Sequence, residues 1–128
     1  ASLARAVGGA ATRAEVERAG LEAFFEFVRR HPALYRIIRQ AEFVDRDVYR
    51  EHYERLAEGY QRGLAEAMRR GEFRDLDPEV LAYCLMGMAE LLGARWLLWD
   101  DASGGKARPP RKVLDTAIEF LLAGARRR

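Results

Sequence analysis

The sequence predicts an all-α protein, an orthogonal helical bundle of about five main helices. Apolar residues recur at helical spacing through most of the 128-residue chain, Gly and Pro separate the repeats, and no stretch alternates as a strand does. Apolar residues make up 49% of the chain, which is enough to bury a core at this length. We therefore expect a single domain over residues 1–128.

The first predicted helix covers roughly residues 13–30. Thr12 and Glu15 have the spacing of a capping box, which pairs the free N–H groups at a helix start. Apolar residues from Val16 to Val28 then recur at helical spacing, and charged residues, Glu17 among them, fall on the other side. Pro32 suits a first helical turn, so "HPALYRIIRQ" predicts a stop followed by a short second helix.

The third predicted helix is long, from about Asp45 to Arg70, with a Tyr- and Leu-bearing stripe opposite a charged one. Gly71 supplies a left-handed cap, Asp77 caps the next helix, and Pro78 fits its first turn. The stretch "GEFRDLDPEV" is therefore a sharp reversal between two helices, which we expect Phe73 to pin to the core.

The fourth predicted helix, residues 80–98, has only Glu90 and Arg95 as charged residues and is apolar all the way round, so it needs to be buried on every side. A membrane span has this length, but both charges would then lie in or near hydrocarbon. We favour a helix with one face inside the subunit and the other against a second subunit. The loop "DDASGGKARPPR" and a final apolar stripe from Val113 to Ala125 follow.

Nothing in the sequence supports an enzyme. The motifs H-E-x-x-H, Glu-x-x-His, Gly-x-Ser-x-Gly and a Gly-rich phosphate loop are all absent. Cys84 is the only cysteine, so we expect no disulfide within the chain, no metal site, and a reducing, cytoplasmic setting. We also expect no cofactor. The net charge of +2 gives this chain no nucleic-acid footprint.

Aromatic side chains with polar tips and adaptable Met side chains suit a mostly apolar pocket, although plain core packing is the alternative. The candidate pocket residues are Phe24, Phe27, Tyr35, Tyr53, Leu56, Tyr60, Tyr83, Met86 and Glu90. Glu90 needs a partner from another helix, another subunit or a ligand, because Arg95 lies about 140° away around the same helix.

The order of these parts resembles the C-terminal regulatory domain of the tetracycline-repressor (TetR) family of bacterial transcription regulators, over essentially the whole chain. The motifs "R-x-H-P-x-L" and "G-x-F-x-x-L-D-P-E" carry the resemblance. It implies that the last two helices of each subunit form a four-helix dimer interface, and that the earlier helices enclose a small-molecule pocket. The implied interface residues are Leu85, Leu92, Trp96, Val113, Ile118, Leu121 and Leu122, while Tyr83, Met86 and Glu90 would face the pocket; the opposite orientation of the fourth helix is the alternative.

The sequence departs from the family in one respect, since nothing matches its N-terminal helix-turn-helix or the aromatic "T-x-Y-x-x-F" end of that motif. Residues 1–8 then correspond to the end of the helix that connects the two domains. The resemblance implies a homodimeric effector-binding domain of a repressor, with a small hydrophobic or aromatic effector and contact to operator DNA only through the missing domain. A ligand-free helical dimerisation or scaffold module is the alternative.

Overall fold

Helices make up nearly all of the chain that the computed structural model describes, which is residues 12–99 and 111–127. In chain order they are α2 (Arg13–Arg30), α3 (Pro32–Val44), α4 (Arg46–Arg69), α5 (Pro78–Gly93), its π-helical continuation η1 (Ala94–Leu98), and α6 (Arg111–Ala125). These described residues contain no β-strand, so the all-α prediction is confirmed. The predicted connecting-helix end at residues 1–8 and most of the predicted loop lie outside the described residues.

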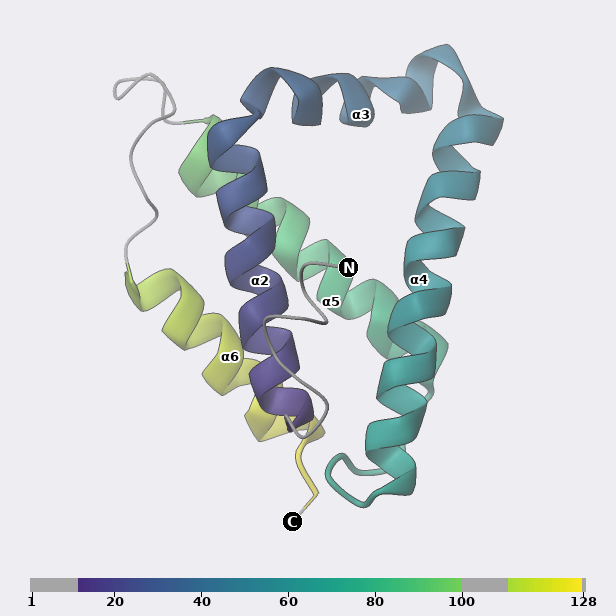
Figure 1. Cartoon of the computed structure of the whole chain (residues 1–128), viewed down its shortest axis with the longest axis vertical. Coiled ribbons are helices and arrows are strands. Elements are labelled where there is room, and N and C mark those ends of the chain that lie inside the picture. The colour runs from purple at the N-terminus through teal and green to yellow at the C-terminus, as the bar shows by residue number, and fades with distance from the viewer. Residues whose placement is uncertain (1–11, 100–110, 128) are drawn as a thin grey trace.

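Helices α2, α3 and α4 form an open frame, and α5 runs diagonally across it (Figure 1). Helices α2 and α4 make the two sides, α3 runs across one end between them, and α5 crosses behind both. Helix α6 lies on the outer side of α2, and α4 packs most extensively on α5. Helix α5 thus packs on both α2 and α4, while α6 packs on α2 and α3 packs on α4.

Local capping chemistry sets the helix ends as predicted. Thr12 Oγ1 accepts a hydrogen bond from the N–H of Glu15 at 3.1 Å, and the Glu15 carboxylate accepts one from the N–H of Thr12, which completes the capping box. Asp77 caps α5 in the same manner, with 3.0 Å from its Oδ1 to the nitrogen of Val80.

The prediction of a short second helix was wrong in length, because α3 continues through "AEFV" to Val44. That stretch contains no Gly or Pro to stop a helix. Asp45 serves both neighbours: its N–H donates to the carbonyl of Ala41 at 2.9 Å, and its side chain caps α4 through the N–H of Val48. The cap residue, not the apolar pattern, determines where α3 ends.

The reversal between α4 and α5 is tied to two other parts of the chain. Gly71 has φ of 79°, the left-handed conformation expected of a C-terminal cap. Phe73 is only 1% exposed, as predicted. The N–H of Arg74 donates to the carbonyl of Ala125 at 2.9 Å, so the reversal also holds the end of α6.

Two apolar clusters make up the core. The α3-side cluster consists of Phe25, Val28, Tyr35, Ala94, Leu97, Leu98 and Val113. The reversal-side cluster consists of Leu64, Ala67, Phe73, Ala82, Leu85, Leu121 and Ala125. Helix α5 contributes Ala82 and Leu85 to the reversal-side cluster, and its continuation η1 contributes Ala94, Leu97 and Leu98 to the α3-side cluster, so this helical stretch joins the two clusters.

Helices α2 and α5 are in close contact at Gly93. A Cβ atom at this position would lie 3.1 Å from Cε2 of Phe24, so the contact depends on the absence of a side chain. The chain then makes a π-helical turn, in which the N–H of Trp99 donates to the carbonyl of Ala94 at 2.9 Å. This turn directs Leu97 and Leu98 into the α3-side cluster.

Candidate functional site

A cavity of about 440 Å³ lies between the two core clusters, where α2, α4 and α5 meet. Its lining includes Arg13, Val16, Glu17, Gly20, Leu21 and Phe24 from α2, Leu56, Gly59 and Tyr60 from α4, Leu85, Met86, Met88, Ala89 and Glu90 from α5, and Ala117, Ile118 and Leu121 from α6. Five of the predicted pocket residues are among them: Phe24, Leu56, Tyr60, Met86 and Glu90. The size falls within the range of about 300–1,000 Å³ that is usual for small-molecule sites.

The other four predicted pocket residues lie elsewhere. Phe27 packs against the α3-side cluster, and Tyr35 is buried within it. Tyr53 lies on the α4 side of Glu90 and also lines a groove on the outer surface. Tyr83 is 44% exposed and lines only that outer groove, so the structure does not bring it to the cavity.

The partner of Glu90 comes from another helix, one of the three sources that the sequence left open. The hydroxyl of Tyr53 on α4 donates a hydrogen bond to Oε1 of Glu90. Burial and this hydrogen bond to the carboxylate raise the pKa of Tyr53 well above its ordinary value. No cationic side chain of the described residues pairs with Glu90, and Arg95 instead lies over the ring of Trp96 at 4.8 Å.

Tyr35 carries an unused hydroxyl in the same region. Its side chain is 2% exposed, and its hydroxyl oxygen has no hydrogen-bond partner among the described residues. Its ring meets Phe24 edge to face, with centroids 5.5 Å apart. Burial, and then the charge of Glu90, raise the pKa of Tyr35 to about 12, so the hydroxyl stays protonated at neutral pH. A buried polar group without a partner costs about 1–3 kcal/mol.

The opposite end of the cavity holds an ion pair that sequence reasoning missed. Glu17 was predicted on the solvent side of its helix, but it is 6% exposed and bonded to Arg13, with 2.9 Å between Nε of Arg13 and Oε1 of Glu17. Gly63 makes room for this pair, since a Cβ there would lie 1.9 Å from Arg13 Nη1. Burial raises the pKa of Glu17, and the charge of Arg13 acts in the opposite direction. The i,i+4 spacing of Arg13 and Glu17 was the available signal.

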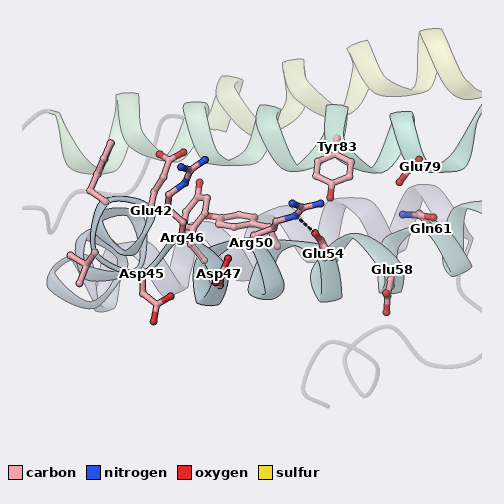
Figure 2. A pocket seen from close by; sticks show the side chains of 14 residues that line it. Glu42, Asp45, Arg46, Asp47, Arg50, Glu54, Glu58, Gln61, Glu79 and Tyr83 are labelled. Atoms are coloured by element: carbon pink, nitrogen blue, oxygen red, sulfur yellow. Dashed lines mark hydrogen bonds and ion pairs between the residues drawn. The ribbon is translucent and has the colours of Figure 1, made fainter.

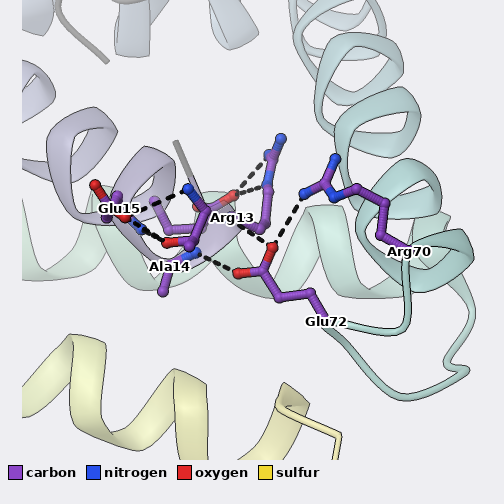
Figure 3. Close-up of polar contacts among 7 residues, drawn as sticks. Arg13, Ala14, Glu15, Arg70 and Glu72 are labelled. Atoms are coloured by element: carbon purple, nitrogen blue, oxygen red, sulfur yellow. Dashed lines mark hydrogen bonds and ion pairs between the residues drawn. The ribbon is translucent and has the colours of Figure 1, made fainter. Parts of the chain in front are cut away.

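The N-terminus of α2 is clasped by the reversal (Figure 3). Oε1 of Glu72 accepts a hydrogen bond from the N–H of Arg13 at 2.8 Å, and Oε2 accepts one from the N–H of Ala14 at 3.1 Å. Arg70 contacts the same carboxylate at 3.0 Å. Burial pushes the pKa of Glu72 upward, but the two N–H groups and Arg70 outweigh it, and the pKa lies below its ordinary value.

Replacing this carboxylate, Glu72→Gln, is expected to lower the free energy of unfolding by about 1–2 kcal/mol at neutral pH, because an amide oxygen can accept only one of the two N–H groups and carries no charge. The folded-state pKa of Glu72 is below the ordinary value of 4.5, so its contribution is complete above that pH and is lost as the pH falls through the folded-state pKa. Urea unfolding from neutral to acid pH should therefore show the wild-type and variant curves converging in acid.

The matched control is Glu66→Gln, which removes an exposed ion pair with Arg69. It should change the free energy of unfolding by no more than about 0.5 kcal/mol. A Glu72→Gln variant as stable as this control, or a difference that persists unchanged in acid, would contradict the clasp.

A larger groove of about 1210 Å³ is lined by the end of α3, by α4 and by the first turns of α5 (Figure 2). Its charged lining residues are Glu42, Asp45, Arg46, Asp47, Arg50, Glu54, Glu58 and Glu79. Arg50 is already paired with Glu54, as Figure 2 shows. No group of three His, Cys, Asp or Glu side chains within residues 12–99 and 111–127 is arranged to hold a metal ion. The groove is a solvated charged surface, and the cavity is the better candidate for a small molecule.

Helices α5 and α6 also present an uncovered apolar surface, which we call the α5–α6 face. It consists of Gly87, Met88, Leu91, Leu92, Trp96, Thr116 and Phe120 and surrounds a hollow of about 670 Å³. Leu91 is 62% exposed and Phe120 is 70% exposed. Three predicted interface residues, Leu92, Trp96 and Val113, line this hollow, and the prediction did not include the two exposed apolar side chains Leu91 and Phe120.

Several of the predicted interface residues lie inside the protomer instead. Leu85, Val113, Ile118 and Leu121 are between 5% and 8% exposed, so they offer almost no surface to a partner in this arrangement. Leu122 is half-buried against the reversal-side cluster. The i, i+4 repeat in residues 113–125 identifies the buried side of α6, and its exposed side holds Phe120.

Comparison with known proteins leaves the chain without an assigned relative: no protein-family model matches it, and neither does any curated protein.

One helical stretch in the described part of the chain, Pro78–Leu98, is long and apolar enough to cross a membrane by length and composition. This is weak evidence, because the core helix of a soluble protein meets the same criterion. In this structure, 33% of its apolar window is buried by other helices of the same chain.

Proposed function

We propose that this chain is the effector-binding and dimerisation domain of a bacterial TetR-like transcription regulator. The observation that carries the proposal is the position of α5 between the cavity and the uncovered α5–α6 face. One side of α5 lines the cavity through Met86 and Glu90, and another side carries the uncovered Leu91. A helix shared by a ligand cavity and a subunit interface is the arrangement that effector-controlled dimers require.

A second copy of the chain is the proposed cover of the α5–α6 face. Gly87 on α5 and Gly124 on α6 have open space where a Cβ would stand, so helices of a second copy could approach closely. Burial of apolar side chains such as Leu91 and Phe120 stabilises association by about 25 cal/mol per Å² of apolar surface removed from water. The proposed dimer interface therefore consists of four helices, namely α5 and α6 of each subunit.

The regulatory step follows from the contacts of the cavity. A ligand would touch α2, α4 and α5 together, and α2 begins at the clasp formed by Glu72. In a full-length repressor, two recognition helices contact operator half-sites about 34–36 Å apart. An effector that favours a different position of α2 relative to the α5–α6 dimer would alter that spacing and release DNA. It can do so only to the extent of its differential affinity for the two states.

The proposed setting is the bacterial cytoplasm, with no catalytic role and with DNA contact made by another domain. A helical dimerisation or scaffold module without a ligand is the second candidate, and the α5–α6 face favours it equally. The cavity distinguishes the two, because a scaffold has no need of a hollow of about 440 Å³ beside the half-buried carboxylate of Glu90.

The test combines sedimentation equilibrium with thermal unfolding in the presence of hydrophobic acids, acyl-CoAs and organic cations. We expect a dimer whose melting temperature rises with one ligand class, since a ligand at 100 times its Kd stabilises the folded state by about 2.7 kcal/mol. A monomer would contradict the dimer, and a dimer that responds to no ligand class would favour the scaffold.

A further inference from the structure

We propose that the Glu90 end of the cavity is a subsite for an organic cation, and that the effector is an amphipathic molecule with an ammonium group on an apolar body. This inference rests on the proposed function only in taking the cavity as the ligand site. Beyond the proposed function, it specifies that the ligand is cationic and that its charged end lies beside Glu90.

The charges of the cavity are the first argument. Its lining contains two carboxylates, Glu17 and Glu90, and one guanidinium, Arg13. Arg13 is bonded to Glu17 at 2.6 Å, so the pair is neutral overall. Glu90 has no cationic partner among the lining residues, and the hydrogen bond from the Tyr53 hydroxyl is its only polar contact in the described chain. A carboxylate in a largely apolar site is best stabilised by a cation.

Aromatic rings around Glu90 are the second argument. Phe24 lines the cavity beside it, and Tyr35 packs edge to face on Phe24. On the other side, the ring of Tyr53 lies 4.7 Å from that of Tyr49. The faces of aromatic rings attract cations, by about 0.5–1 kcal/mol when exposed and about 2 kcal/mol when desolvated. Phe24 belongs to the cavity lining, whereas Tyr49 and Tyr53 line the outer groove on the other side of Glu90. A carboxylate between aromatic rings is a composition that attracts ammonium groups.

The unpartnered hydroxyl of Tyr35 is the third argument. It is buried, has no hydrogen-bond partner among the described residues, and belongs to a ring that packs edge to face on Phe24 of the cavity lining. A tyrosine oxygen accepts as well as donates hydrogen bonds, so it can receive an N–H from an ammonium group. A bound amine beside Phe24 would therefore give a partner to a buried hydroxyl that has none among the described residues.

The apolar middle of the cavity accounts for the rest of the ligand. Leu56, Met86 and Ala89 contribute apolar surface to the lining, and the thioether of Met86 adapts to different shapes. An anionic ligand has no free cation to meet, because the only guanidinium in the lining is engaged by Glu17. The cavity should therefore discriminate by charge.

The experiment compares three probes of similar shape by isothermal titration calorimetry: the cation phenylbutylammonium, the uncharged alcohol 4-phenylbutan-1-ol, and the anion phenylpentanoate. The wild-type chain should bind the cation at least about tenfold more tightly than either other probe, which corresponds to about 1.4 kcal/mol. Glu90→Gln should reduce that preference to about twofold or less, because the amide keeps its shape and can still accept from Tyr53 but has no charge.

Two further variants control for location and folding. Glu17→Gln changes the other carboxylate of the same cavity and should keep the preference for the cation. Ala89→Trp fills the cavity and should abolish binding of every probe, with the helical circular dichroism and the sedimentation profile unchanged.

Each outcome decides the inference. Cation binding that survives Ala89→Trp, a preference for the cation that survives Glu90→Gln, or no binding of the cation to the wild-type chain would overturn it. Tighter binding of the uncharged or anionic probe in the cavity would overturn it as well. That last result would leave the proposed function standing, because a ligand would still occupy the site.

Discussion

Replacing Phe73 with alanine is expected to lower the free energy of unfolding by about 3–5 kcal/mol, as truncation of fully buried Phe side chains usually does. Phe73 is the largest of the fully buried side chains described in the structure, at 1% exposure. It packs in the reversal-side cluster, and its N–H donates to the carbonyl of Ala67 at 3.2 Å. The surrounding segments are held by backbone hydrogen bonds and cannot readily collapse into the space that would be left.

Urea unfolding followed by circular dichroism at one fixed protein concentration measures this effect, since dimerisation would make stability depend on concentration. Phe43→Ala is the control of identical chemistry, because Phe43 is 85% exposed. It should change the free energy of unfolding by less than about 0.5 kcal/mol. Equal effects of the two substitutions would mean that the reversal is not anchored through Phe73.

The second large effect concerns association. The double substitution Leu91→Glu and Phe120→Glu should convert the proposed dimer to a monomer. Burial of one such side chain contributes about 1.5–3 kcal/mol to the free energy of association. Because the dimer has two-fold symmetry, each substitution changes two positions in the interface. The new carboxylates would also have to be buried without partners. Sedimentation equilibrium should therefore show the dissociation constant rising by several powers of ten.

A second apolar surface on α3 provides the matched control. Leu34 is 47% exposed and Ile37 is 62% exposed, so Leu34→Glu with Ile37→Glu introduces the same charges at side chains that are also exposed. This variant should remain a dimer. If it dissociates and the α5–α6 variant does not, the subunits associate through α3 instead.

Local chemistry made the helix boundaries predictable. The Thr12 capping box, the positive φ of Gly71 and the Asp77 cap each depend on a few neighbouring residues, and the structure has all of them. The end of α3 was less predictable, since a helix without a breaker continues until a competing cap stops it, and Asp45 lies beyond the clear apolar repeat.

The faces of the helices were harder to predict than their ends. Residues 80–98 are apolar all round, so the spacing of their apolar residues does not indicate which face of the helix is buried. Nothing in the sequence distinguishes Leu85, which is buried, from Leu91, which is exposed. Glu17 was misplaced for a related reason, because its burial depends on Gly63, a distant residue that leaves room for Arg13. Five of the nine pocket candidates line the cavity because aromatic and Met side chains concentrate on the inner stripes of α2, α4 and α5.

The clasp at Glu72 has a consequence for how the molecule opens. Helix ends normally fray independently of one another, and their amide protons exchange quickly. Here the first turn of α2, the reversal, and the end of α6 share hydrogen bonds through Glu72, Arg74 and Ala125. These three segments can separate only together, so they form one cooperative unit of local unfolding at the chain's periphery. The amide protons of Arg13, Ala14 and Arg74 should then exchange in a single event, at a rate set by the whole unit.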